Sequence, residues 1–136
     1  MKTWSKELSF LTHEKREVVD LTDKILDAVK QSGVKNGLLV AQLPHATAAL
    51  VLNEDEGGLK RDLLDKLEDF APVQGGYHHD YIDDNAHAHL KSAFIGSSRV
   101  LPIVDGRVIR GAWQNFLVIE EDGPRTRRLV LFVMGE

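Results

Sequence analysis

Apolar positions alternate along both ends of the chain, and this spacing predicts strands there. Trp4, Leu8 and Phe10 stand among polar neighbours, and the short run at residues 17–19 can pair back onto them. The last third contains four further strand-like segments, with Asp-Gly turns after the first and the third, at residues 99–104, 107–109, 114–120 and 127–134. The pattern favours an antiparallel sheet.

Helical spacing appears between these strands. Thr22 predicts the N-cap of a short amphipathic helix that Gly33 would close. A second helix reaches Phe70 and is indicated by leucines at helical intervals, namely Leu59, Leu63, Leu64 and Leu67. Residues 86–94 have short helical character. We therefore expect three helices within a sheet protein.

Two central segments, residues 37–43 and 46–52, are rich in Leu, Val and Ala and predict two more strands. Pro44 and His45 interrupt them, so His45 is expected at a strand edge, where its side chain is displayed. No internal repeat, linker or low-complexity tract is visible. The sequence thus predicts one α+β domain over residues 1–136, an extended antiparallel sheet with helices packed on one face.

Composition narrows the classes of function. The chain has no cysteine, which excludes disulfides and thiolate metal sites, and its net charge of −4 gives no support to nucleic-acid binding. No apolar run has the length of a signal peptide or of a membrane span, so we expect a cytoplasmic protein with no membrane partner. Any metal site must use His, Asp or Glu.

Histidines are concentrated in one polar segment: of the six in the chain, four lie between residues 77 and 89. His45, His79 and His89 could supply three nitrogen ligands to a divalent metal ion such as zinc and leave one position for water or substrate. The spacing matches no standard local zinc motif, and a solvated polar loop with locally hydrogen-bonded histidines is the alternative. For His13 and His87 we prefer that simpler interpretation.

Four other positions attract attention. Glu54 follows a buried-looking strand and either belongs to a turn that caps the next helix or brings a carboxylate toward His45. Glu120 follows an apolar run, and burying its carboxylate would be costly unless a cation or metal were paired with it. Arg127 could bind a phosphate or carboxylate bidentately, or be solvated. Trp113 is expected to anchor the core.

Five ordered segments together resemble the YjbQ family, also named the secondary thiamine-phosphate synthase family: residues 45–50 with Asn53-Glu54, 77–81, 84–91, 111–114 and 120–127. The resemblance covers nearly the whole chain. It implies an α+β fold, a homotrimer, and a pocket shared between subunits. It also implies that His45, His79 and His89 form the metal or catalytic set, supported by Glu54, Asp84, Glu120 and Arg127. His78 could replace His79, which the Tyr-x-His-Asp-Tyr context favours.

The activity that the resemblance implies is the joining of hydroxymethylpyrimidine diphosphate to thiazole phosphate with loss of pyrophosphate. Such a transfer needs two phosphorylated small molecules to be positioned and the charge of the departing group to be stabilised. Two alternatives remain open. One is a metal- or metabolite-binding protein that does no chemistry, and the other is a metal-dependent hydrolase in which Glu54 or Glu120 is the general base.

Overall fold

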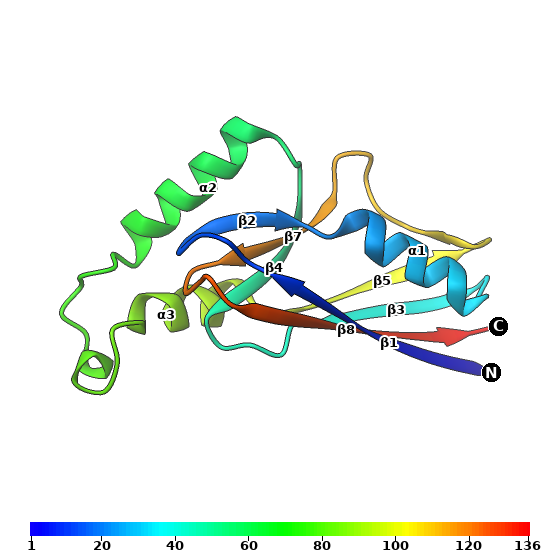
Figure 1. Ribbon diagram of the computed structural model, residues 1–136. Coiled ribbons are helices and arrows are strands. Elements are labelled where there is room, and N and C mark those ends of the chain that lie inside the picture. Colours follow the sequence, from blue (N-terminus) through cyan, green and yellow to red (C-terminus); the bar gives the residue numbers. More distant parts are fainter.

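The computed structural model describes residues 1–136 and contains two antiparallel sheets and three α-helices (Figure 1). In chain order the elements are β1 (Lys2–Leu11), β2 (Glu17–Asp20), α1 (Thr22–Ser32), β3 (Gly37–Gln42), β4 (Ala48–Asn53), α2 (Gly57–Phe70), the 3₁₀ turn η1 (His78–Tyr81), α3 (Ala86–Ile95), β5 (Ser98–Val104), β6 (Arg107–Val108), β7 (Asn115–Glu120) and β8 (Thr126–Gly135). The α+β class and its antiparallel strands are confirmed.

The strands divide into a five-stranded sheet, β1-β8-β3-β5-β6, and a three-stranded sheet, β2-β7-β4. The longest pairing joins β1 to β8, from Lys2 opposite Gly135 to Leu11 opposite Thr126. In the small sheet β7 is central because Glu120 opposes both Glu17 of β2 and Ala48 of β4. One predicted sheet is therefore two, and the loop from β3 to β4 carries the chain from one to the other.

Alternation along the strands separates an inner from an outer face of the large sheet. Leu39 and Ala41 of β3 point into a core of 18 buried residues that also contains Ile25 of α1 and Phe116 of β7. Helix α1 packs on β1, β7 and β8, α3 packs on β4, and α2 contacts β2. No helix is long and apolar enough to cross a membrane. The core thus lies between the two sheets and under α1.

Two local predictions are corrected. Thr22 is the first residue of α1 rather than its cap, and the Asp20 carboxylate accepts hydrogen bonds from its backbone N–H (2.9 Å) and its hydroxyl (2.6 Å). The Thr22 hydroxyl oxygen instead accepts from the Phe116 N–H at 2.8 Å. Trp113 is no core anchor, because β7 begins only at Asn115 and the indole, in the loop before it, is 72% exposed.

Candidate functional site

His79 and His89 come together beside the segment that links α2 to α3. His79 lies in η1 and His89 in α3, and their imidazole rings meet edge to face with centroids 4.8 Å apart. They border a pocket of about 390 Å³ whose other lining includes Tyr77, His78, Ala86 and Leu90. The structure therefore joins two of the three predicted histidines, and His78, although exposed, borders the same pocket.

Local hydrogen bonds explain why His79 is presented there. The Tyr77 N–H donates to the Asp80 carboxylate at 3.0 Å, and the Tyr77 hydroxyl donates to the carbonyl of Pro72 at 2.8 Å. The turn closes where the Ile82 N–H donates to the His79 carbonyl at 2.9 Å. These contacts hold a short polar segment that has no buried residue of its own.

A chain of polar contacts orients the His79 ring. Its Nε2 lies 3.2 Å from Asn85 Oδ1, and Asn85 Nδ2 donates to Asp122 Oδ2 at 2.9 Å. A carboxylate only accepts, so the Asn85 amide must turn its NH₂ to Asp122 and its oxygen to His79. His79 Nε2 therefore carries the proton, which leaves the lone pair of Nδ1 free for a metal or a substrate proton.

Asp122 anchors this chain of contacts from the turn after β7. Lys15 Nζ lies 3.0 Å from Asp122 Oδ1, and Arg125 Nη2 lies 3.0 Å from Oδ2. Burial raises the pKa of the Asp122 carboxyl, but hydrogen bonds from Asn85 and Lys15 with the nearby positive charges outweigh burial and hold the pKa below its ordinary value. Sequence reasoning missed Asn85 and Asp122, although both lie in segments of the family resemblance.

Glu120 and Arg127 form a buried ion pair that joins β7 to β8. Arg127 Nε donates to Glu120 Oε2 at 2.8 Å and Nη2 donates to Oε1 at 2.5 Å, while Nη2 also contacts the Thr47 hydroxyl at 3.0 Å. Glu120 is 0% and Arg127 2% exposed. Of the alternatives that the sequence left open, the structure shows a cation paired with Glu120 and a bidentate carboxylate contact for Arg127, whereas a catalytic role for either residue stays a prediction. The Glu120 carboxylate and the Arg127 guanidinium connect β7 to β8, and neither residue lines a pocket.

His45 lies outside the His79–His89 pocket. Its Nε2 accepts the backbone N–H of Arg128 at 2.9 Å, so a neutral ring has its proton on Nδ1. Burial, together with the positive charge of Arg127, lowers the pKa of His45. The lone pair that a metal would need is already used, and no three His, Asp or Glu side chains in the chain converge as a metal site. A metal role for His45 stays a prediction.

The remaining predicted residues are dispersed. Glu54 borders a separate pocket of about 370 Å³ with Asp55 and Trp113. It lies beyond the Asn53 end of β4, whereas His45 precedes the Ala48 end, and six strand residues separate these ends by about 17 Å. Within one chain Glu54 therefore does not reach His45. The helix cap is Glu56, which accepts from the Leu59 N–H at 3.0 Å.

Acid should weaken the hydrogen bonds and ion pairs of Glu120 and Asp122. The pKa of Glu120 is raised by burial, but hydrogen bonds from Arg127 and the Asp122 N–H outweigh this and lower it overall, and the Asp122 pKa is lowered too. Their stabilisation is complete above the unfolded-state values, 4.5 and 3.8, and is lost as pH falls through the lower folded-state values. Urea unfolding from pH 7 to pH 2 should show a drop below about pH 4.5, and Asp122→Asn should reduce its slope. An unchanged slope in that variant would contradict the assignment.

Comparison with known proteins shows which family the chain resembles. Residues 6–136 match the family model described as "UPF0047 protein YjbQ-like". A UPF0047 protein of Archaeoglobus fulgidus is 42% identical over 125 residues, 92% of this chain and 97% of that one. The crystal structure of a YbjQ-like protein of unknown function from Sulfolobus solfataricus P2 has a TM-score of 0.97 at 41% identity and covers 99% of both chains.

A second solved structure gives the same result. A hypothetical protein from Aeropyrum pernix K1 has a TM-score of 0.94 at 40% identity, over 100% of both chains. A UPF0047 protein of Methanothermobacter thermautotrophicus is 35% identical over all of this chain and 95% of its own length. All residues of the five segments quoted from the sequence lie within the matched range. The chain belongs to the YjbQ-like UPF0047 family.

Proposed function

We propose that the protein is an enzyme for small phosphorylated molecules whose centre is the His79–His89 pair. The observation that carries this proposal is the orientation of His79 by Asn85 and Asp122, which leaves Nδ1 without a protein partner on a ring that lies beside His89 and lines a pocket of about 390 Å³. Hydrogen bonds of this kind orient imidazoles that bind metals or move protons. A purely structural histidine pair would not need to line a pocket with one ring nitrogen left unpartnered.

A divalent ion such as zinc fits this pair in chemistry, because both ligands are imidazoles and one already has a hydrogen-bonded second nitrogen. Such an ion would stabilise negative charge on a leaving phosphate or pyrophosphate. Two histidines do not complete a site, so further ligands must come from solvent, substrate or a second chain. His45 can join only if it gives up the Arg128 N–H.

The reaction that we propose resembles thiamine-phosphate synthesis, the transfer of the hydroxymethylpyrimidine group to thiazole phosphate with release of pyrophosphate. The hydrolase alternative has less support because Glu120 is fully engaged by Arg127 and Glu54 borders a different pocket. Neither carboxylate stands near the His79–His89 pocket as a free general base. Lys15 and Arg125, each 3.0 Å from the Asp122 carboxylate and about half exposed, are the cations beside this chain of contacts that could meet a phosphate.

We propose further that the protein is a homotrimer. The outer face of the large sheet is apolar, with Leu38 40%, Val100 58% and Phe132 39% exposed. The patch is continuous because Val40 pairs with both Val100 and Phe132. An exposed apolar surface of this kind marks a contact between proteins. A second copy is the occupant we favour, because β3 and β8 carry this face toward His45, at a site that one chain leaves incomplete.

Phe132→Asp should dissociate this assembly, because a carboxylate would be buried in an apolar contact. Light scattering should give the mass of one 15.2 kDa chain for the variant and three times that mass for the unaltered protein. Asp62→Asn, on the exposed side of α2, is the matched control and should not change the mass. A monomeric unaltered protein, or an unaffected Phe132→Asp assembly, would defeat the proposal for this face.

Asn85→Ala tests the catalytic proposal at the residue that carries it. Pyrophosphate release from the diphosphate and thiazole phosphate pair should fall about 10- to 100-fold, because His79 loses the group that fixes its proton. Chelation should abolish turnover in both proteins, and thermal unfolding should confirm that the variant is folded. Full activity in Asn85→Ala would contradict the proposed role of the hydrogen bonds from His79 through Asn85 to Asp122. Absence of turnover in the unaltered protein with added metal would favour ligand binding without chemistry.

A further inference from the structure

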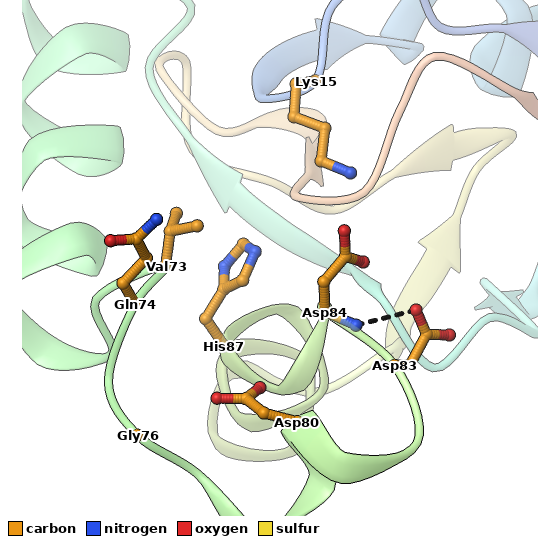
Figure 2. A pocket seen from close by; sticks show the side chains of 8 residues that line it. All are labelled: Lys15, Val73, Gln74, Gly76, Asp80, Asp83, Asp84 and His87. Atoms are coloured by element: carbon orange, nitrogen blue, oxygen red, sulfur yellow. Dashed lines mark hydrogen bonds between the residues drawn. The ribbon is translucent and has the colours of Figure 1, made fainter.

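A second cavity, of about 350 Å³, borders the segment between α2 and α3 (Figure 2). It is lined by Val73, Gln74 and Gly76 of the segment after α2 and by Lys15, Asp80, Asp83, Asp84 and His87. It shares only Gly76 with the His79–His89 pocket. One residue that we expected in the catalytic set, Asp84, lines this cavity instead.

His87 is the unusual member of the lining. It is 1% exposed, and its Nδ1 lies 2.9 Å from Nζ of Lys91, which is equally buried. Lys91 Nζ is also 2.6 Å from Glu121 Oε1, and Arg16 Nε donates to the same oxygen at 2.7 Å. The sequence predicted only local hydrogen bonding for His87. The structure instead places it in a buried cluster with Lys91, Glu121 and Arg16.

The cluster fixes the proton of His87. An ammonium group donates and does not accept, so His87 Nδ1 is the acceptor and Nε2 must carry the hydrogen. No group of the protein accepts from Nε2, since the only hydrogen bond of the side chain is the one to Lys91. Figure 2 shows the ring upright in the cavity, between Val73 and Asp84 and below Lys15. The side chain as a whole is 1% exposed, but its unpartnered Nε2–H is not fully enclosed, and the ring lines the cavity.

Three carboxylates set the charge of the cavity. Asp80 and Asp83 each use an oxygen for a backbone N–H, of Tyr77 at 3.0 Å and of Asp84 at 2.8 Å, and the Asp84 carboxylate has no partner. The ammonium of Lys15 is paired with Asp122 at 3.0 Å. The carboxylates do not converge as a metal site. The cavity therefore suits a ligand that donates to carboxylates and accepts from one fixed N–H.

We propose that this cavity is a second small-molecule site, for a compound with an amino group beside a hydrogen-bond acceptor. The acceptor takes the His87 Nε2–H, and the amino group lies among Asp80, Asp83 and Asp84. Aminated nitrogen heterocycles and amino alcohols share this chemistry. The inference does not depend on the reaction proposed above, because neither His79 nor His89 lines this cavity.

Long-range ¹H–¹⁵N NMR spectra of the full chain, labelled at histidine, test the proposal. The free protein should show His87 protonated on Nε2, and titration with 4-aminopyrimidine or with ethanolamine should shift the His87 signals in a saturable way. The probe that saturates at lower concentration identifies the source of the ligand. Pyrimidine, which has no amino group, is the matched control and should bind at least about tenfold more weakly. His13 signals should not move.

Two variants separate binding from folding. His87→Phe keeps a flat ring but removes both the Nε2–H donor and the Nδ1 acceptor of Lys91, whereas Asp83→Asn changes only an exposed carboxylate. Each should lower affinity for the bound probe at least about tenfold, which corresponds to roughly 1.4 kcal/mol. If His87→Phe does not fold, the affinity of Asp83→Asn and the position of the proton on the His87 ring of the unaltered protein still test the proposal. A proton on Nδ1, unchanged affinity in Asp83→Asn, or no saturable shift with either probe would overturn the proposal.

Discussion

Arg127→Met is expected to lower the free energy of unfolding by about 3–5 kcal/mol, because it leaves the Glu120 carboxylate buried without its cation. Glu120 is fully buried at the end of the central strand β7, and Arg127 also holds Thr47 of the β3–β4 loop. The loss should therefore loosen the contact between the two sheets. Urea unfolding measured at pH 7 gives the value directly.

The double variant Glu120→Met with Arg127→Met is the critical comparison. It removes both charges, so it should recover much of the loss, since apolar replacements of a buried ion pair are often close to neutral. Arg128→Met is the matched surface control, because its half-exposed side chain pairs with Glu7 in solvent, and it should change stability by less than about 0.5 kcal/mol. Equal losses for Arg127→Met and Arg128→Met would refute the account of the pair.

His79→Ala and His89→Ala should each reduce turnover by at least about 100-fold while the fold is kept. Both side chains are partly exposed at the pocket, and neither belongs to the core, so little packing is lost. Pyrophosphate release measures activity, and circular dichroism with thermal unfolding measures the fold.

The exposed His13 supplies the control for these two variants. His13→Ala should retain full activity, because it removes an imidazole of the same size from a position outside both pockets. Full turnover in His79→Ala or His89→Ala would exclude the pair as the reacting centre. Loss of activity together with loss of the fold would show instead that the pair is structural.

Patterns within short segments were sufficient to predict much of the fold. The alternation in β1 indicated a strand there, and the alternation in β8 and the leucines of α2 indicated these elements to within two residues. Gly33 closes α1 in the left-handed conformation, with φ of 72°. The charge of Glu120 after an apolar run correctly implied a cation. Such inferences succeed because the physical cause lies within a few neighbouring positions.

The candidate site depends on distant contacts, and these could not be predicted. Asn85 meets Asp122 across 37 positions, and Lys91 meets Glu121 across 30. Asp122 looked like a turn residue, and nothing local indicated that it faces Asn85. Conversely, Glu54 and His45 are close in sequence, but the extended strand β4 carries them apart. Sequence showed which groups can do chemistry, whereas topology decides which of them meet.

The most direct test of the central claim is elemental analysis of the purified protein, per chain, compared with His79→Ala and His89→Ala after identical dialysis. If the pair is the metal-dependent centre of the proposed reaction, the unaltered protein should hold close to one zinc or similar divalent ion per chain. Both variants should lose it while remaining folded. Metal retained in both variants, or none in the unaltered protein under conditions where it is active, would contradict the claim.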